Sequence, residues 1–87
     1  MENLNLGKTR ITDTIRVSSA GIAYQETEWG VPYYQYETFI FSDNPKFRTR
    51  MFIWGTSSGH EPLEKMGKLT ERAHRRIAKV MLSHKWE

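Results

Sequence analysis

Residues 31–42, VPYYQYETFIFS, carry the strongest β-strand signal in the chain. Tyrosine, phenylalanine, threonine and isoleucine dominate the segment, and these residue types favour a pleated, half-buried surface. Before it stands Trp29-Gly30, where glycine suits the positive φ of a tight hairpin, and after it comes Asp43-Asn44-Pro45-Lys46, a run typical of turns. We therefore expect a strand here with a chain reversal at each end.

Three more strands are predicted around this segment, because short apolar and β-branched runs alternate with turn residues. The four expected strands cover residues 10–18, 22–28, 31–42 and 47–54. In the first, Ile11, Ile15 and Val17 lie on one side. Ser19-Ala20-Gly21 then has the composition of a turn. Residues 1–9 are expected to be a flexible leader.

Residues 60–84 have the period of an amphipathic helix. Its apolar stripe consists of Leu63, Met66, Leu69, Ala73, Ile77, Val80 and Met81. His74 lies at the edge of this stripe, where we interpret it as a packing or capping residue rather than a catalytic one. Short connections between strands favour a meander. The prediction is an α+β fold, with a four-stranded antiparallel meander sheet over residues 10–54 and one C-terminal amphipathic helix packed on one face.

The size and composition of the chain limit what it can be. Eighty-seven residues with 38% hydrophobic content suffice for one domain, which we expect to span residues 1–87. The absence of cysteine excludes a disulfide framework and a thiolate metal site. No segment approaches the roughly 20 apolar residues that a membrane span requires. We expect a soluble cytoplasmic protein without a cofactor or metal.

The helix also has a cationic side, which we call the cationic arc. It consists of Lys65, Lys68, Arg72, Arg75, Arg76 and Lys79. Like charges three or four residues apart destabilise a helix by roughly 0.2–0.5 kcal/mol per pair. An acidic group outside the helix would relieve this repulsion, which predicts contact with phosphate or with an acidic protein; the alternative is a solvated helix face. The arc contains no Asn, Gln or Ser to recognise base edges, so sequence-specific nucleic-acid recognition is not supported.

The predicted turns assign side chains to two sheet faces. They place Val17 opposite Ile22, Tyr24 opposite Gln35, and Phe39 opposite Arg50. The face expected under the helix then carries Ile11, Ile15, Val17, Ile22, Tyr24, Phe39, Phe41, Phe52 and Trp54. The opposite face carries an apolar cluster of Tyr34, Tyr36, Ile40, Met51 and Ile53. Because one helix covers only one face, we expect this cluster to be an exposed interface, for a second copy or for a partner protein.

Other interpretations of single groups are weaker. Tyr34 and Tyr36 resemble a platform for stacking bases, but their apolar neighbours favour a protein contact. Glu26, Glu28 and Glu37 lack a ligand-bearing loop, so we interpret them as a solvated hairpin end rather than a cation site. No arrangement of nucleophile, base and oxyanion donors is apparent, and we expect no enzymatic activity.

The segment Tyr36-Glu37-Thr38-Phe39-Ile40-Phe41 resembles a group of small uncharacterised phage and prophage proteins with a Tyr/Phe-Glu-Thr-hydrophobic-hydrophobic-Phe strand. Val17-Ser18-Ser19 and Gly21-Ile22 match upstream elements of that group, and Arg72-Ala73-His74 matches its helix. The resemblance spans most of residues 17–80. It departs at Lys65-Met66-Gly67, where an aromatic-Ser-Thr entry is expected.

This resemblance implies a phage-borne accessory protein that acts in the cytoplasm of a bacterial host cell. It also implies an anti-defence role like that of anti-CRISPR proteins. Combined with the two surfaces, it leads us to expect a non-enzymatic binding protein, a homodimer, that engages a host protein or protein–nucleic acid complex and inhibits a nucleic-acid-targeting defence system. The alternative expectation is sequence-independent binding of nucleic acid or of a nucleotide signal.

Overall fold

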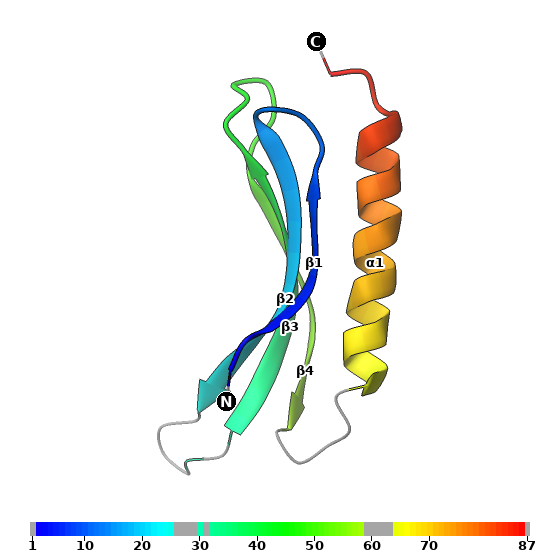
Figure 1. The fold of residues 1–87 in the computed structure, drawn as a ribbon. Helices are drawn as coiled ribbons and strands as arrows, with labels where there is room; N and C mark the ends of the chain where they lie inside the picture. Colours follow the sequence, from blue (N-terminus) through cyan, green and yellow to red (C-terminus); the bar gives the residue numbers. More distant parts are fainter. Residues whose placement is uncertain (1, 26–29, 31, 59–63, 87) are drawn as a thin grey trace.

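The computed structural model describes residues 2–25, 30, 32–58 and 64–86. Four strands form one antiparallel sheet in the order β1-β2-β3-β4, and the helix lies along one face of it (Figure 1). The elements are β1 (Leu4–Arg10), β2 (Ile15–Gln25), β3 (Pro32–Ser42), β4 (Arg50–Ser58) and α1 (Glu64–Ser83). The predicted α+β fold of four antiparallel strands and a C-terminal helix is confirmed.

β2 runs without interruption through the segment predicted to be a turn. Ser19 pairs with Thr38 of β3, and Gly21 pairs with Tyr36. A Cβ at Gly21 would lie 3.3 Å from both Leu4 and the ring of Tyr36. The small residues at this point therefore make room for neighbouring side chains and do not reverse the chain. The prediction of two separate strands over 10–18 and 22–28 is wrong.

The segment predicted to be a flexible leader contains β1. This strand pairs antiparallel with β2, beginning with Leu4 opposite Gly21. Its short polar sequence, LNLGKTR, has little apolar content of its own. Because β2 is longer than predicted, β1 has a partner strand along its whole length. The leader expected over residues 1–9 is thus largely an edge strand.

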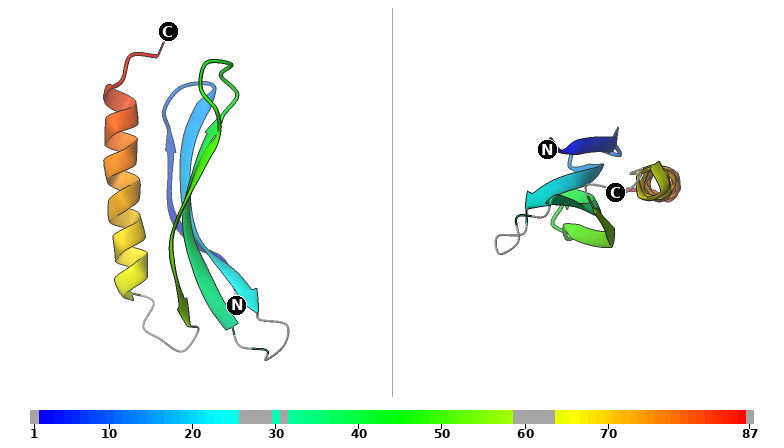
Figure 2. Two further views of the ribbon diagram at one scale, coloured as in Figure 1. Left: turned by 180° about the vertical axis from the view of Figure 1, so that it is seen from behind. Right: turned by 90° about the horizontal axis from the view of Figure 1, so that it is seen from below.

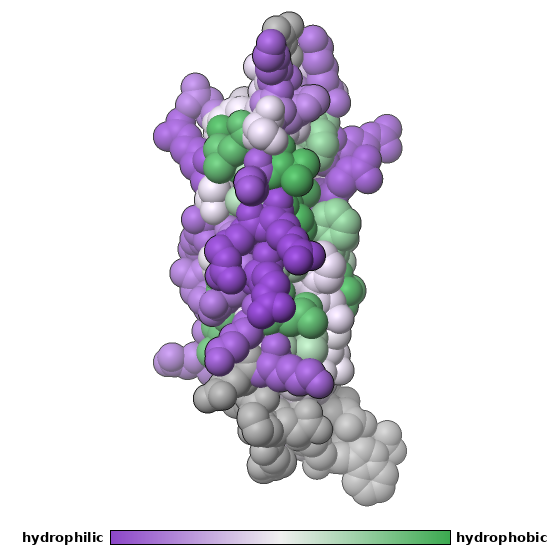
Figure 3. Space-filling model, turned by 90° about the vertical axis from the view of Figure 1, so that its right-hand side faces the viewer, coloured by the Kyte–Doolittle hydropathy of each residue, from purple (hydrophilic) through white to green (hydrophobic). Residues whose placement is uncertain are grey.

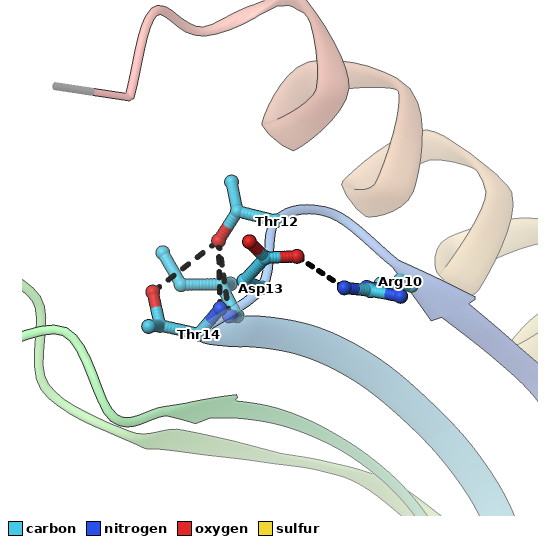
Figure 4. Close-up of polar contacts among 5 residues, drawn as sticks. Arg10, Thr12, Asp13 and Thr14 are labelled. Carbon is cyan, nitrogen blue, oxygen red and sulfur yellow. Dashed lines mark hydrogen bonds and ion pairs between the residues drawn. The ribbon is translucent and has the colours of Figure 1, made fainter.

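The turn between β1 and β2 is held by side chains within residues 10–15. The Thr12 hydroxyl accepts hydrogen bonds from the backbone N–H groups of Thr14 and Ile15, each at 3.1 Å. Arg10 and Asp13 form an ion pair across the same turn (Figure 4). These contacts place the chain reversal where a strand was expected.

The hairpin between β2 and β3 lies mostly outside the described residues. Gly30 has a φ of 66°, in the left-handed region that the predicted hairpin glycine requires. The rest of the predicted Trp29-Gly30 turn, with Glu26 and Glu28, is outside the described part of the chain.

Strand pairing differs from the prediction on both sides of β3. Val17 lies opposite Ile40, and Tyr24 lies opposite Tyr33. Phe39 lies opposite Met51, one residue beyond the predicted partner. Tyr24 shares a face with Phe39 and Phe41, as predicted, but β2 is continuous, so Tyr24 and Val17 lie on opposite faces. The predicted faces of β3 are therefore exchanged relative to Val17 and the helix. The one-residue shift between β3 and β4 leaves Met51 on its predicted face.

The apolar core lies between α1 and the sheet, nearer the C-terminal end of the helix. It consists of Ile15, Val17, Ile40 and Met81, with Ile11, Phe47, Ile77 and Trp86 packed against it. Toward the other end, the fully buried Tyr36 hydrogen-bonds Ser57 through its hydroxyl at 3.0 Å. Phe39 and Phe41, which were expected in this core, alternate with its residues and project from the opposite face.

α1 is turned about its axis relative to the predicted apolar stripe. Thr70, His74 and Ala78 are buried against the sheet, whereas Leu69 and Val80 are exposed, Val80 by 67%. The sheet beneath the helix offers buried hydroxyl groups as well as apolar side chains, and buried polar groups require hydrogen-bond partners. His74 supplies them, as described below.

Candidate binding surfaces

The cationic arc lies on the solvent side of α1. All six of its residues are exposed. Figure 3 shows the corresponding band of hydrophilic side chains along the helix, bordered by hydrophobic ones. Within the described residues the sole ion pair joins Arg10 to Asp13, so no described carboxylate lies within salt-bridge distance of the arc. The structure thus places the predicted arc together on one surface and leaves its charges mutually repelling.

The arc is long enough to contact an extended anion. Lys65 and Lys79 are 14 residues apart in the helix, a span of about 21 Å at the helical rise. Lysine and arginine along such a line neutralise several phosphates or several carboxylates at once. The arc therefore has the chemistry of an electrostatic docking surface.

The second surface is the sheet face opposite α1, which we call the open face. Its apolar residues, by strand register and alternation, are Ile22, Tyr24, Tyr33, Phe39, Phe41, Met51 and Ile53. Figure 2 shows the helix on the other side of the sheet and no described element over this face. Ile53 is 54% exposed and Met51 48% exposed. Clusters of exposed apolar side chains of this kind mark contact sites.

Aromatic side chains on the open face pack on one another in pairs. Phe39 and Phe41 stack with ring centroids 4.9 Å apart, and Tyr24 and Tyr33 stack at 5.5 Å. The guanidinium carbon of Arg16 lies 5.1 Å from the centre of the Phe41 ring. These contacts hold rigid, flat apolar surface toward solvent.

The five residues predicted to form the exposed interface are divided between the two faces. Tyr34, Tyr36 and Ile40 are buried on the helix side, so neither an interface nor base stacking there is correct. Met51 and Ile53 are on the open face as predicted. The cause is the uninterrupted course of β2, which places Phe39 and Phe41 on the face opposite Val17 and Ile40 beside Val17. An uncovered apolar face exists, with a different set of residues.

Glu37 occupies the middle of the open face, and only 8% of its surface is exposed. Its carboxylate accepts a hydrogen bond of 3.1 Å from the Gln35 side chain. The expectation of a solvated carboxylate at a hairpin end is wrong for this residue, because it pairs with Ala20 in the middle of β2. Within the described part of the chain, no three His, Asp or Glu residues are grouped to hold a metal.

A buried polar chain connects the helix to every strand. His74 Nε2 lies 2.9 Å from the Thr9 hydroxyl and His74 Nδ1 lies 2.8 Å from the Ser19 hydroxyl. Ser19 in turn lies 2.6 Å from the Thr38 hydroxyl, to which the Trp54 indole N–H donates at 2.8 Å. The network locks the helix at one position over the sheet, because His74 loses both of its hydroxyl partners, Thr9 and Ser19, if α1 slides.

The geometry and electrostatics of this network indicate that it stabilises the fold. Ser19 and His74 form a hydroxyl–imidazole pair, and both are buried. His74 lines a surface hollow beside Thr9 and Arg75, but the Ser19 hydroxyl is not part of that lining. Burial lowers the pKa of His74, and the positive charge of Arg75 lowers it further. Of the two roles predicted for His74, packing and capping, the structure shows packing against the sheet. The hydroxyl partners of His74 give no signal in the sequence, since Ser19-Ala20-Gly21 has the composition of a turn.

Comparison with protein-family models, with curated proteins and with solved structures found no match to this chain. The helix in the described part of the chain is not apolar enough to cross a membrane.

Proposed function

We propose that this protein is a non-enzymatic binding protein that acts as a dimer. The open face pairs two copies, and the cationic arc of each copy docks on an acidic surface of a partner protein or protein–nucleic acid complex. The observation that carries the proposal is the uncovered apolar face centred on Phe39, with Met51 and Ile53 exposed beside it. Two such sheets pack face to face with interdigitating side chains.

Charges on the open face favour a second copy as its occupant. Arg16 of β2 lies opposite Phe41, which follows Phe39 by two residues along β3. Glu37 precedes Phe39 by two residues on the same strand and the same face. A twofold axis near Phe39 places Glu37 of one copy toward Arg16 of the other, and the same pair forms again by symmetry. The buried carboxylate and the guanidinium would then neutralise each other across the interface.

The dimer leaves the cationic arcs free. The helix covers the face opposite the interface (Figure 2), and all six residues of the arc are exposed. Each dimer therefore presents two separated basic surfaces to acidic partners, which adds avidity when both engage one complex. This arrangement suits an accessory protein that occupies the surface of a host machine, including one that targets nucleic acid.

A charge exchange tests the pairing. Arg16→Glu alone brings two carboxylates together and should weaken dimerisation roughly tenfold or more, and Glu37→Arg should do the same. The double variant Arg16→Glu/Glu37→Arg restores the complementary pair and should restore the dimer, as measured by sedimentation equilibrium. If the folded double variant is as monomeric as Arg16→Glu, the proposed interface is wrong.

A second experiment tests the arc. Lys68→Glu/Arg75→Glu should abolish capture of a partner from host lysate, whereas Lys46→Glu/Arg48→Glu makes the same charge change in the β3–β4 loop and should leave capture intact. Both pairs are exposed, so stability should change little. Equal loss in the two variants would mean that net charge, not the arc, determines binding.

Nucleic acid is the second candidate partner, favoured by the absence of any ion pair between the arc and a described carboxylate. In that case binding to DNA or RNA should weaken steeply as salt rises, and Lys68→Glu/Arg75→Glu should reduce the slope against salt. No binding at low salt leaves the acidic protein surface as the partner.

A further inference from the structure

A groove separates α1 from β4 on the helix side of the sheet. The helix packs more closely on β1 and β2 than on β4, so this flank is open. The groove has a volume of about 410 Å³ and is lined by Trp54, Leu69, Arg72, Ala73, Arg76 and Ile77. It lies on the opposite side of the sheet from the open face and is independent of the proposed dimer interface.

The floor of the groove is apolar and held in place. The Trp54 indole N–H donates to the buried Thr38 hydroxyl, and the Trp54 ring stacks on Phe52 with centroids 5.7 Å apart and 13° between the planes. Trp54 therefore has its polar atom satisfied inside the protein. Phe52 and Leu69 remain exposed beside it. Pockets for small ligands are usually apolar clefts of roughly 300–1,000 Å³ with a few polar groups, and this groove fits that description.

The rim of the groove is cationic. Arg72 and Arg76 are four residues apart on α1, and both line the groove. Neither forms an ion pair with a described carboxylate. Guanidinium groups bind phosphate oxygens in a bidentate manner, and an anion between the two arginines would remove their mutual repulsion. An apolar aromatic floor beside two phosphate-binding groups matches a flat base attached to a phosphate.

We propose that this groove binds a nucleoside phosphate. The base packs against Trp54 and Leu69, and the phosphates contact Arg72 and Arg76. A nucleoside contacts only the apolar floor and a free phosphate contacts only the arginines, so a nucleotide that reaches both should bind more tightly than either part.

Isothermal titration calorimetry with ADP, GDP, CDP and UDP tests the proposed nucleotide site directly. Adenosine and inorganic pyrophosphate are titrated as part-ligands, each carrying one half of a nucleotide. At least one nucleoside diphosphate should bind roughly tenfold or more tightly than either part-ligand. Arg72→Gln/Arg76→Gln should remove the tighter binding of the nucleotide. Arg75→Gln/Lys79→Gln removes the same charge on the other flank of the helix and should preserve the tighter binding. Trp54→Phe, which keeps an aromatic ring, should weaken nucleotide binding and leave pyrophosphate unaffected.

Three results would overturn the proposal. They are no binding of any of the four nucleotides, pyrophosphate binding as tight as nucleotide binding, or an equal loss of nucleotide affinity in Arg72→Gln/Arg76→Gln and Arg75→Gln/Lys79→Gln. The oligomeric state of the same samples reports separately on the dimer, so failure of one proposal is distinguishable from failure of the other.

Discussion

His74 on α1 and Ser19 on β2 share a buried hydrogen bond of 2.8 Å between the imidazole Nδ1 and the hydroxyl, where the helix packs on the sheet. This contact joins residues 55 positions apart in the chain. It explains why the helix turns a histidine, rather than its more apolar flank, toward the sheet.

Removing the Ser19 hydroxyl should therefore destabilise the fold. Ser19→Ala leaves His74 Nδ1 and the Thr38 hydroxyl each without one partner, at a cost of about 1–3 kcal/mol in the free energy of unfolding. Urea unfolding measures the change. The control is Ser18→Ala, which removes a hydroxyl from the neighbouring residue of β2, on the open face of the sheet. It should change the free energy of unfolding by less than about 0.5 kcal/mol. Equal effects would contradict a special role for the network.

Acid should also weaken the fold through His74. Its pKa is lowered from 6.5 in the folded protein, so it stays neutral there while the unfolded chain takes up a proton. The stabilisation is fully present above the unfolded value and is lost as the pH falls through the folded pKa. The urea midpoint should decrease as the pH is lowered below about 6.5. His74→Asn should flatten this dependence, whereas the exposed His84→Asn should preserve it.

The close approach of β1 to the same histidine predicts a strong effect at Gly7. Its φ is 151°, and an added Cβ would lie 2.7 Å from the His74 ring. Gly7→Ala should cost more than about 2 kcal/mol through strain and collision. Thermal unfolding can test this together with a double variant: Gly7→Ala should cost less in a His74→Ala background, since the collision is then gone. Strict additivity would show that the histidine is not the obstacle.

The fold class and the cationic arc were predictable because both rest on local periodicity. Residues 31–42 had β-forming side chains between two turns, and α1 had a clear 3.6-residue pattern with all its surplus charge on one side. Neither inference depends on where distant segments meet.

The strand register was not predictable from the same patterns. Ser19 and Gly21 have turn propensity, and only the His74 and Tyr36 side chains packed against them explain why small residues stand there. That misplaced turn put Val17 and Tyr24 on one predicted face, whereas they lie on opposite faces of the continuous β2. Phe39 shares the face of Tyr24, so Phe39 and Ile40 exchanged places relative to the helix. Both faces of β3 are apolar, so hydrophobic alternation could not correct the error.

The oligomeric state in solution tests the central claim most directly. Light scattering coupled to size exclusion should give twice the chain mass of 10.3 kDa, and Met51→Lys/Ile53→Lys, which places two charges on the open face, should give the monomer with its fold intact by circular dichroism. A wild-type mass of 10.3 kDa at all concentrations, or an unchanged dimer in the folded lysine variant, would contradict pairing through this face.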